Sequence, residues 1–379
     1  MIPYGRQNIS ADDINAVVEV LRSDFLTQGP AVHRFEKAVA DYCSVAHAVA
    51  VNSATSALHI ACLALNVGPG DYVWTSTNSF VASANCARYC GAAVDFVDID
   101  AESYNLSFGS LSEKLFEAKQ RNKLPKVVIP VHFAGEPCCM QEIHALSLEY
   151  GFRIIEDASH AIGAEYRNSR IGDCTYSDIT VFSFHPVKII TTAEGGMTTT
   201  RSPELCRRMQ LLRSHGITRD GNELEVQSEG AWYYEQQSLG FNYRMTDLQA
   251  ALGISQLSNI DCWIETRHRI ASRYDRELSG MPIILPKRSA NSRSALHLYA
   301  VQVSSRREVF DFMRAAGIGV NVHYIPIHTQ PDFRRLWKPL SPMPIAENYY
   351  SNCMSLPIYA SLTDAEQTHV IRTLQEAIR

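Results

Sequence analysis

Seven short apolar runs recur along the first 200 residues, and this repetition limits the fold more than any other feature of the chain. Stretches of helical period lie between several of them, such as the apolar stripe at positions 57, 58, 61, 62 and 65. Strands that alternate with helices predict a mainly parallel sheet covered on both faces. We therefore expect an α/β fold with strands at residues 48–51, 72–75, 93–97, 127–131, 153–156, 179–184 and 197–200.

The last third of the chain has a different pattern. A long helical stretch is predicted from Thr246 to about Leu278, with Thr246 and Asp247 as its start. Two prolines and a polar segment at 287–294 then indicate a joint. Beyond it we expect strands at 298–303 and 319–323, a helix at 307–316 and a final helix after Asp364. These patterns divide the chain into a large α/β domain at residues 1–255 and, at 256–379, a linking helix with a smaller α+β domain.

The composition limits which kinds of partner the chain is expected to bind and in which cellular compartment it is expected to work. A chain of 379 residues suits two domains, and its net charge of −5 argues against nucleic acid or an anionic membrane as a partner. Polar residues interrupt the most apolar stretch, 48–65, so we expect no membrane span, and no secretory signal is evident at the start. Ten scattered cysteines without zinc spacing predict buried thiols in a reducing cytoplasm and no metal site.

The first chemical motif lies at residues 51–58, where a strand ends, small residues turn and an apolar helix begins. Free N–H groups and the positive end of the helix dipole favour a phosphate there. The hydroxyls of Ser53, Thr55 and Ser56 add further donors. The alternative is an ordinary helix N-cap, which needs only one such hydroxyl.

The second motif is the carboxylate pair Glu156 and Asp157, followed by His160, at the end of a predicted strand. Ligands of α/β sheets bind beyond the carboxyl ends of the strands, so we expect Asp157 to face a ligand. A carboxylate there could keep a pyridinium nitrogen protonated. A helix N-cap or a structural ion pair remains an equally good interpretation of these residues alone.

The third motif is Lys188, in a loop after a predicted strand, with Val187, Ile189 and Ile190 as neighbours. Apolar surroundings disfavour the ammonium form and leave a nucleophilic amine, as a Schiff-base lysine requires. Most lysines are solvated surface residues, which is the alternative. The glycine pair at 195–196 allows a close backbone approach before the next strand.

Taken together and in this order, the motifs resemble the DegT/DnrJ/EryC1/StrS family of sugar aminotransferases, which are fold-type-I enzymes that depend on pyridoxal 5′-phosphate (PLP). The resemblance implies a large, mainly parallel seven-stranded sheet domain and a smaller C-terminal α+β domain. It extends over nearly the whole chain and is carried by residues 26–30, 52–58, 79–82, 156–161, 183–196, 213–216, 240–245 and 322–328.

The resemblance also implies roles around the cofactor. Lys188 would bind PLP covalently and carry the proton between the Cα atom of the amino acid and C4′ of the cofactor. Asp157 would pair with the pyridine nitrogen, and His160 would lie near the ring hydroxyl. Phe80 would stack on the ring, although without the resemblance a core aromatic residue is the default interpretation.

The same resemblance gives the phosphate of the cofactor a set of partners, namely Ser53, Ala54, Thr55 and Ser183. Asn242 would join them from a second copy of the chain, which implies a homodimer with shared active sites. Taken alone, Asn242 is more simply read as a turn residue.

Within the family, the runs at 185–196 and 322–328 most resemble transaminases of pseudaminic-acid biosynthesis. The substrates would be L-glutamate and a UDP-linked 4-keto-6-deoxy-N-acetylhexosamine, aminated at C4 to UDP-4-amino-4,6-dideoxy-N-acetyl-β-L-altrosamine. A bacillosamine- or legionaminic-type aminotransferase, a PLP-dependent sugar dehydratase (which would have histidine at position 188) and a non-enzymatic regulator are the alternatives. The residues expected to contact the nucleotide sugar are Tyr4, Asp24, Phe25, Leu26, Thr27, His323, Tyr324, Ile325 and Pro326.

Overall fold

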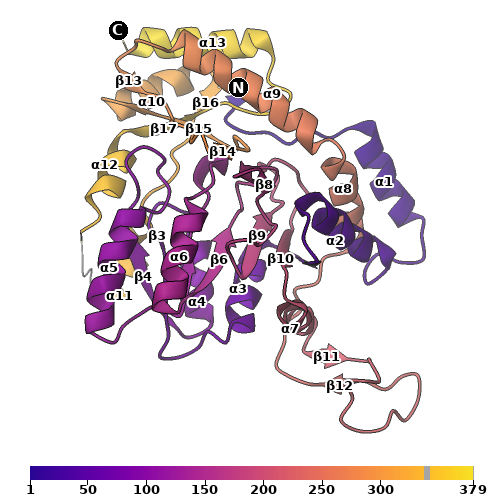
Figure 1. The fold of residues 1–379 in the computed structure, drawn as a ribbon. Helices are drawn as coiled ribbons and strands as arrows, with labels where there is room; N and C mark the ends of the chain where they lie inside the picture. Colours follow the sequence, from indigo (N-terminus) through magenta and orange to yellow (C-terminus); the bar gives the residue numbers. More distant parts are fainter. Residues whose placement is uncertain (337–341, 379) are drawn as a thin grey trace.

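The computed structural model describes residues 1–336 and 342–378, and its centre is a seven-stranded sheet of order β2-β10-β9-β6-β5-β3-β4 (Figure 1). β10 is antiparallel to β2 and β9, and the other neighbouring strands are parallel. Each predicted run forms one of these strands, with ends within about two residues, so the expected fold class is confirmed. The strands are β2 (His47–Val51), β3 (Tyr72–Ser76), β4 (Ala93–Val97), β5 (Val127–Ile129), β6 (Arg153–Asp157), β9 (Ile179–Ser183) and β10 (Gly196–Thr200).

Helices cover both faces of the sheet, and each face has its own apolar core. One core is formed with α2 (Pro30–Cys43), α5 (Phe108–Gln120), α6 (Met140–Tyr150) and α8 (Asp247–Leu257). The other is formed with α3 (Ala54–Ala64), α4 (Ala82–Tyr89) and α7 (Pro203–Arg213). α1 (Ala11–Leu21) packs on α8 at the end of the molecule (Figure 1). Burial on both faces explains why the strands read as continuous apolar runs.

Strand order brings the three sequence motifs to one edge of the sheet. β6 ends at Asp157 and the parallel strand β9 ends at Ser183. Gly196, the first residue of β10, lies opposite both Ser183 and Val51. A Cβ atom on Gly196 would lie 2.5 Å from the carbonyl carbon of Ser53, so only glycine lets β10 pack against the start of α3.

The predicted long helix is two helices, α8 and α9 (Ile260–Glu277). Its predicted start is confirmed, because Thr246 and Gln249 form a capping box. The break lies at Ser258 and Asn259, whose side chains donate to the carbonyl of Ser255 at 2.6 and 3.4 Å. Such side-chain bonds compete with the helical ladder, a signal that apolar periodicity does not contain.

The C-terminal part contains a second, antiparallel sheet of order β13-β15-β17, formed by β13 (Ile283–Ile284), β15 (Tyr299–Val303) and β17 (Cys353–Leu356). The strand expected at 319–323 is only the short β16 (Ile318–Gly319), which pairs with β1 (Ile2–Pro3). The first residues of the chain therefore lie beside the C-terminal part (Figure 1), and the domain division remains a prediction. The helices here are α10 (Arg306–Ala315), α11 (Pro331–Leu336), α12 (Pro344–Asn352) and α13 (Asp364–Ala377).

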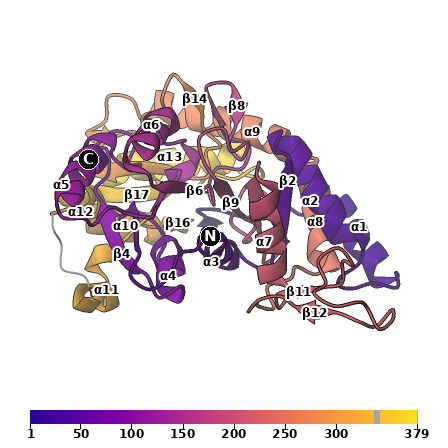
Figure 2. The same ribbon diagram turned by 60° about the horizontal axis from the view of Figure 1, so that its bottom comes forward.

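Smaller elements complete the fold. β11 (Ile217–Thr218) and β12 (Glu235–Gln236) form a two-stranded ribbon in an arm that extends away from the body (Figures 1 and 2). A small sheet of order β14-β7-β8 joins β14 (Ser292–Arg293), β7 (Glu165–Tyr166) and β8 (Ser169–Arg170), and two 3₁₀ turns are η1 (Phe133–Gly135) and η2 (Ile327–Thr329). Within the described residues, every helix is too short or too polar to cross a membrane.

Candidate active site

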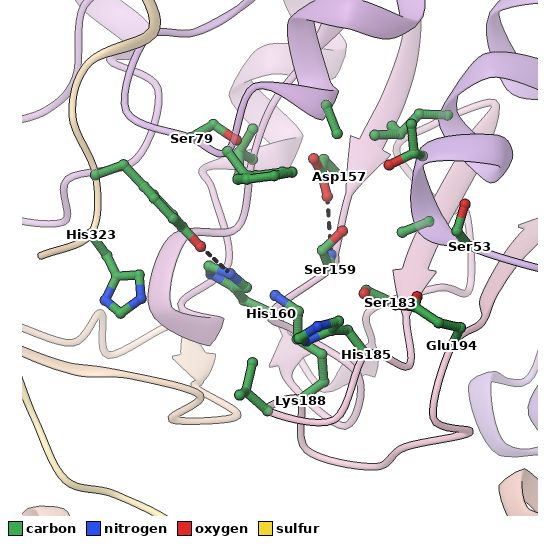
Figure 3. A pocket seen from close by; sticks show the side chains of 18 of the residues that line it. Ser53, Ser79, Asp157, Ser159, His160, Ser183, His185, Lys188, Glu194 and His323 are labelled. Atoms are coloured by element: carbon green, nitrogen blue, oxygen red, sulfur yellow. Dashed lines mark hydrogen bonds between the residues drawn. The ribbon is translucent and has the colours of Figure 1, made fainter. Parts of the chain in front are cut away.

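A cavity of about 580 Å³ opens where β6 and β9 end (Figure 3). This volume is within the range typical of small-molecule sites. Eleven of the residues predicted from the sequence line it, and they come from segments far apart in the chain. These residues are Tyr4, Ser53, Ala54, Thr55, Phe80, Asp157, His160, Ser183, Lys188, His323 and Tyr324.

Lys188 presents its amine to the cavity from the loop after β9 (Figure 3). Burial lowers the pKa of this amine to about 8, although the negative charge of Asp157 opposes the shift. A lysine with such a pKa has a substantial neutral fraction near neutral pH and can act as a nucleophile or a base. This lowered pKa has the direction expected for a lysine among apolar neighbours, which favour the neutral amine.

The carboxylate of Asp157 is buried and held in one orientation. Its Oδ2 atom accepts a hydrogen bond from Ser83 Oγ at 2.6 Å, and Oδ1 accepts one from the backbone N–H of Ser159 at 3.1 Å. Ser83 is itself linked to Ser79, with 2.7 Å between the two hydroxyl oxygens. The cavity thus contains a carboxylate whose orientation is fixed in part by Ser83, a residue of α4.

The neighbouring carboxylate, Glu156, has a structural role. Side chains alternate along a strand, so Glu156 points to the opposite face from Asp157. It pairs with His132 at 2.7 Å and accepts hydrogen bonds from Thr180 and Ser177. Burial would raise the pKa of Glu156, but these bonds outweigh it and lower the pKa, so the carboxylate stays charged.

His160 is a neutral, fully partnered imidazole. Its Nδ1 atom accepts the backbone N–H of Ala134 at 3.3 Å, so Nε2 carries the proton and donates it to Tyr324 Oη at 3.0 Å (Figure 3). Burial, together with the positive charge of Lys188, places the pKa of His160 well below its ordinary value. Burial raises the pKa of Tyr324, which therefore keeps its own proton.

The start of α3 forms an anion-binding corner of the cavity. Ser53 is the N-cap residue, and its hydroxyl accepts the N–H of Ser56 at 3.1 Å. The first N–H groups of a helix have no partner within the helix, so those of Ala54 and Thr55 are available to a ligand. Phe80 lies at the cavity and is 59% exposed, which leaves its ring free to stack on a ligand.

Seven predicted residues lie outside the lining of this cavity. Asp24 and Phe25 line a separate hollow between α1, α2 and α8, and Ile325 lines one beside η2. Asn242 is exposed after the arm, where it forms a β-bridge with Ser214. A single chain therefore does not bring these residues to Lys188; the full set is Asp24, Phe25, Leu26, Thr27, Asn242, Ile325 and Pro326.

Sequence reasoning missed several residues of the cavity, among them Ser159, His185, Glu194 and Asn321. Ser159, His185 and Glu194 lie inside recognised motifs, so their position was a signal that could have been used. Ser83, which orients Asp157 from 74 positions away, has no local signal at all.

Comparisons with known proteins agree with this geometry. The model of the DegT/DnrJ/EryC1/StrS aminotransferase family matches residues 7–375. The chain belongs to this family. It is 36% identical to a UDP-4-amino-4,6-dideoxy-N-acetyl-beta-L-altrosamine transaminase of Campylobacter jejuni, over 99% of this chain and 96% of the relative. It is also 36% identical to the spore coat polysaccharide biosynthesis protein SpsC of Bacillus subtilis, over 100% of this chain and 97% of the relative.

Solved structures show the same fold. Helicobacter pylori PseC, an aminotransferase involved in the biosynthesis of pseudoaminic acid, superposes with a TM-score of 0.90 at 30% identity, covering 100% of this chain and 99% of that one. The PLP form of the sugar aminotransferase Spr1654 from Streptococcus pneumoniae also gives 0.90, at 29% identity and 99% and 98% coverage. This member of the family is therefore a sugar aminotransferase that uses PLP, and the expected fold-type-I architecture is confirmed.

The cavity has the features that PLP requires. A lysine amine with a lowered pKa can bond to the aldehyde of PLP, and a carboxylate held in one orientation can pair with its ring nitrogen. The N-terminus of a helix can receive its phosphate. The close approach that Gly196 permits between β10 and α3 places these three features around one space.

Proposed function

We propose that this aminotransferase moves the amino group of L-glutamate to C4 of a UDP-linked 4-keto-6-deoxy-N-acetylhexosamine, giving UDP-4-amino-4,6-dideoxy-N-acetyl-β-L-altrosamine. The observation that carries the proposal is the full-length likeness to the Campylobacter jejuni transaminase of that sugar, combined with a complete lysine–aspartate cavity. The likeness to Helicobacter pylori PseC supports the same sugar class.

In this proposal Lys188 bonds to the cofactor, Asp157 pairs with its ring nitrogen, and Ala54, Thr55 and Ser183 receive its phosphate, next to the N-cap Ser53. When bound, PLP supplies an electron sink that stabilises negative charge on the substrate carbon. Phe80 would cover one face of the ring and exclude water from it.

Lys188 also moves the proton. With PLP bound, the neutral amine of Lys188 would take the proton from the α-carbon of glutamate and hold it on Nζ for return. In the second half of the reaction the same group delivers a proton to C4 of the sugar. General acid–base catalysis of this kind contributes typically about 10²–10⁴-fold to a rate.

His160 assists by holding Tyr324 in place. Because both ring nitrogens of His160 are engaged, the hydroxyl proton of Tyr324 is left to face the cavity. His323 lies beside Tyr4 at a ring distance of 5.1 Å and accepts or donates one bond with Ser355 at 2.8 Å. We assign Tyr4, His323 and Tyr324 to the nucleotide sugar.

A second copy of the chain completes the site in our proposal. The predicted residues that lie away from the cavity belong to three segments, 24–27, 242 and 325–326. Asp24 and Phe25 line the hollow beside α1, and Asn242 is exposed after the arm. We infer a homodimer in which Asn242 reaches the phosphate of the partner's cofactor, working in the cytoplasm, where nucleotide sugars are made. Light scattering tests the dimer directly, and a monomer at working concentration would refute it.

The sugar is tested by offering the purified enzyme L-glutamate with the arabino- and the xylo-configured UDP-4-keto sugars in separate reactions. Products are identified by NMR. We expect turnover of the arabino substrate alone. Turnover of the xylo substrate alone would keep the aminotransferase chemistry and move the enzyme to a bacillosamine- or legionaminic-type pathway.

A further inference from the structure

His185 is a cavity histidine without a partner in its own chain. It lies three residues before Lys188, and both residues line the cavity (Figure 3). Across residues 1–336 and 342–378 its exposed side chain makes no hydrogen bond, ion pair or ring contact. The other two cavity histidines differ, since His160 binds Tyr324 and His323 binds Ser355.

As one chain forms it, the cavity contains little positive charge. Among the described residues no arginine lines it, and Lys188 is its only lysine. Burial lowers the pKa of His323 to about 3 and that of His160 well below its ordinary value, so both rings stay neutral near pH 7. Lys188 cannot serve as a permanent cation, because it is the group that reacts. Among the described residues of the lining, His185 is the remaining basic side chain.

An amino donor brings a carboxylate next to the reacting amine. A buried or half-buried carboxylate requires a cationic or hydrogen-bonding partner, since leaving it unpaired is costly. The phosphate corner lies at the N-terminus of α3, where N–H donors and hydroxyls are already present. The carboxylate of the amino donor therefore needs a partner other than that corner.

We propose that His185 binds the carboxylate of the amino donor, as an imidazolium, and so positions the donor amine at Lys188. The inference rests on the proposed aminotransferase reaction and adds the group that recognises its first substrate. Pro186 follows directly, and proline restricts the backbone of the residue before it, so the imidazole is presented from a restrained loop.

A pH dependence follows from this role. An imidazolium binds a carboxylate more tightly than a neutral ring does, because the hydrogen bond is then charge-assisted. Affinity for a carboxylate should therefore fall as the pH rises and the imidazolium is lost. The charged and titratable groups facing the same space are Lys188, Asp157, Glu194, His160, His323, Tyr4 and Tyr324.

The test uses the PLP-loaded enzyme and the unreactive dicarboxylate succinate, with binding measured by isothermal titration calorimetry. His185→Asn keeps a hydrogen-bonding side chain and removes the charge. We expect about a tenfold weaker binding of succinate at pH 6, which is typical of the loss of one charge-assisted hydrogen bond, and little remaining pH dependence. His185→Lys should restore binding. His369→Asn, at an exposed position of α13 outside the cavity lining, is the control and should bind as the unmodified enzyme does.

UDP serves as the second probe, since it offers phosphates instead of carboxylates. Equal succinate binding in the His185→Asn variant and the unmodified enzyme would overturn the inference. A variant that loses affinity for UDP alone, or for UDP and succinate equally, would also overturn it. The sugar assignment fails separately. An enzyme that loses succinate binding as expected but aminates neither keto sugar would refute the proposed substrate and keep the role of His185.

Discussion

The ionisation of Lys188 gives a quantitative prediction. With the ordinary lysine pKa of 10.5, about 0.1% of the amine would be neutral at pH 7.5, whereas a pKa of about 8 leaves about 24% neutral. Burial in the cavity thus makes the reactive form roughly 200-fold more abundant. Asp157 opposes this shift, so Asp157→Asn should lower the pKa of Lys188 further.

The assay is competitive acetylation of the cofactor-free chain, with site-by-site readout by mass spectrometry. A lysine amine reacts only when it is neutral, so labelling of Lys188 should rise with pH and level off above about 8. Lys37, an exposed lysine with 75% of its side chain accessible, is the internal reference for the reagent. Asp157→Asn should shift the Lys188 profile to lower pH and leave the reference profile in place. A Lys188 profile that coincides with the reference would refute the argument from burial.

Three further substitutions test the framework of the site. Ser83→Ala removes a buried hydrogen bond to the cavity carboxylate and should weaken PLP binding about tenfold by fluorescence titration, with Ser83→Thr close to normal. Gly196→Ala forces a Cβ into the backbone that begins α3 and should cost about 1–3 kcal/mol of unfolding free energy in denaturant, whereas Gly221→Ala, in open space, should cost little. His132→Ala leaves Glu156 buried without its partner and should cost about 3–5 kcal/mol in the same measurement; a loss below 1 kcal/mol would contradict the role of the pair.

The large sheet could be predicted from the sequence because each strand is buried on both faces. Burial on both faces requires short runs of β-branched residues, whereas the helices between them show apolar residues at helical spacing. The two patterns locate the strands to within about two residues. The small C-terminal sheet was predicted less well. β16 has only two residues, and its partner β1 comes from the opposite end of the chain, a pairing that leaves no local pattern.

The residues of the candidate site also fall into two groups, those that the sequence could identify and those that it could not. Residues 53, 55 and 157 could be identified because each stands at a strand end or a helix start, where backbone geometry creates a binding position. Lys188 was identified from its apolar neighbours in the loop after β9, and Ala54 and Ser183 through the family resemblance. Ser83 and His297 were not identifiable. Ser83 acts on Asp157 across 74 positions, and His297 packs its ring 4.4 Å from that of His160 without lining the cavity. Their importance depends on tertiary contacts that spacing does not encode.

The contrast between Glu156 and Asp157 shows why adjacent carboxylates need not share a role. Strand alternation sends them to opposite faces of β6. Glu156 meets an imidazole and two hydroxyls, and these contacts keep it charged inside the protein. Asp157 meets two hydrogen-bond donors and the cavity, so part of its charge remains available to a ligand. The sequence alone allowed a structural ion pair or a ligand carboxylate as alternatives for this motif, and the strand accommodates both, one on each face.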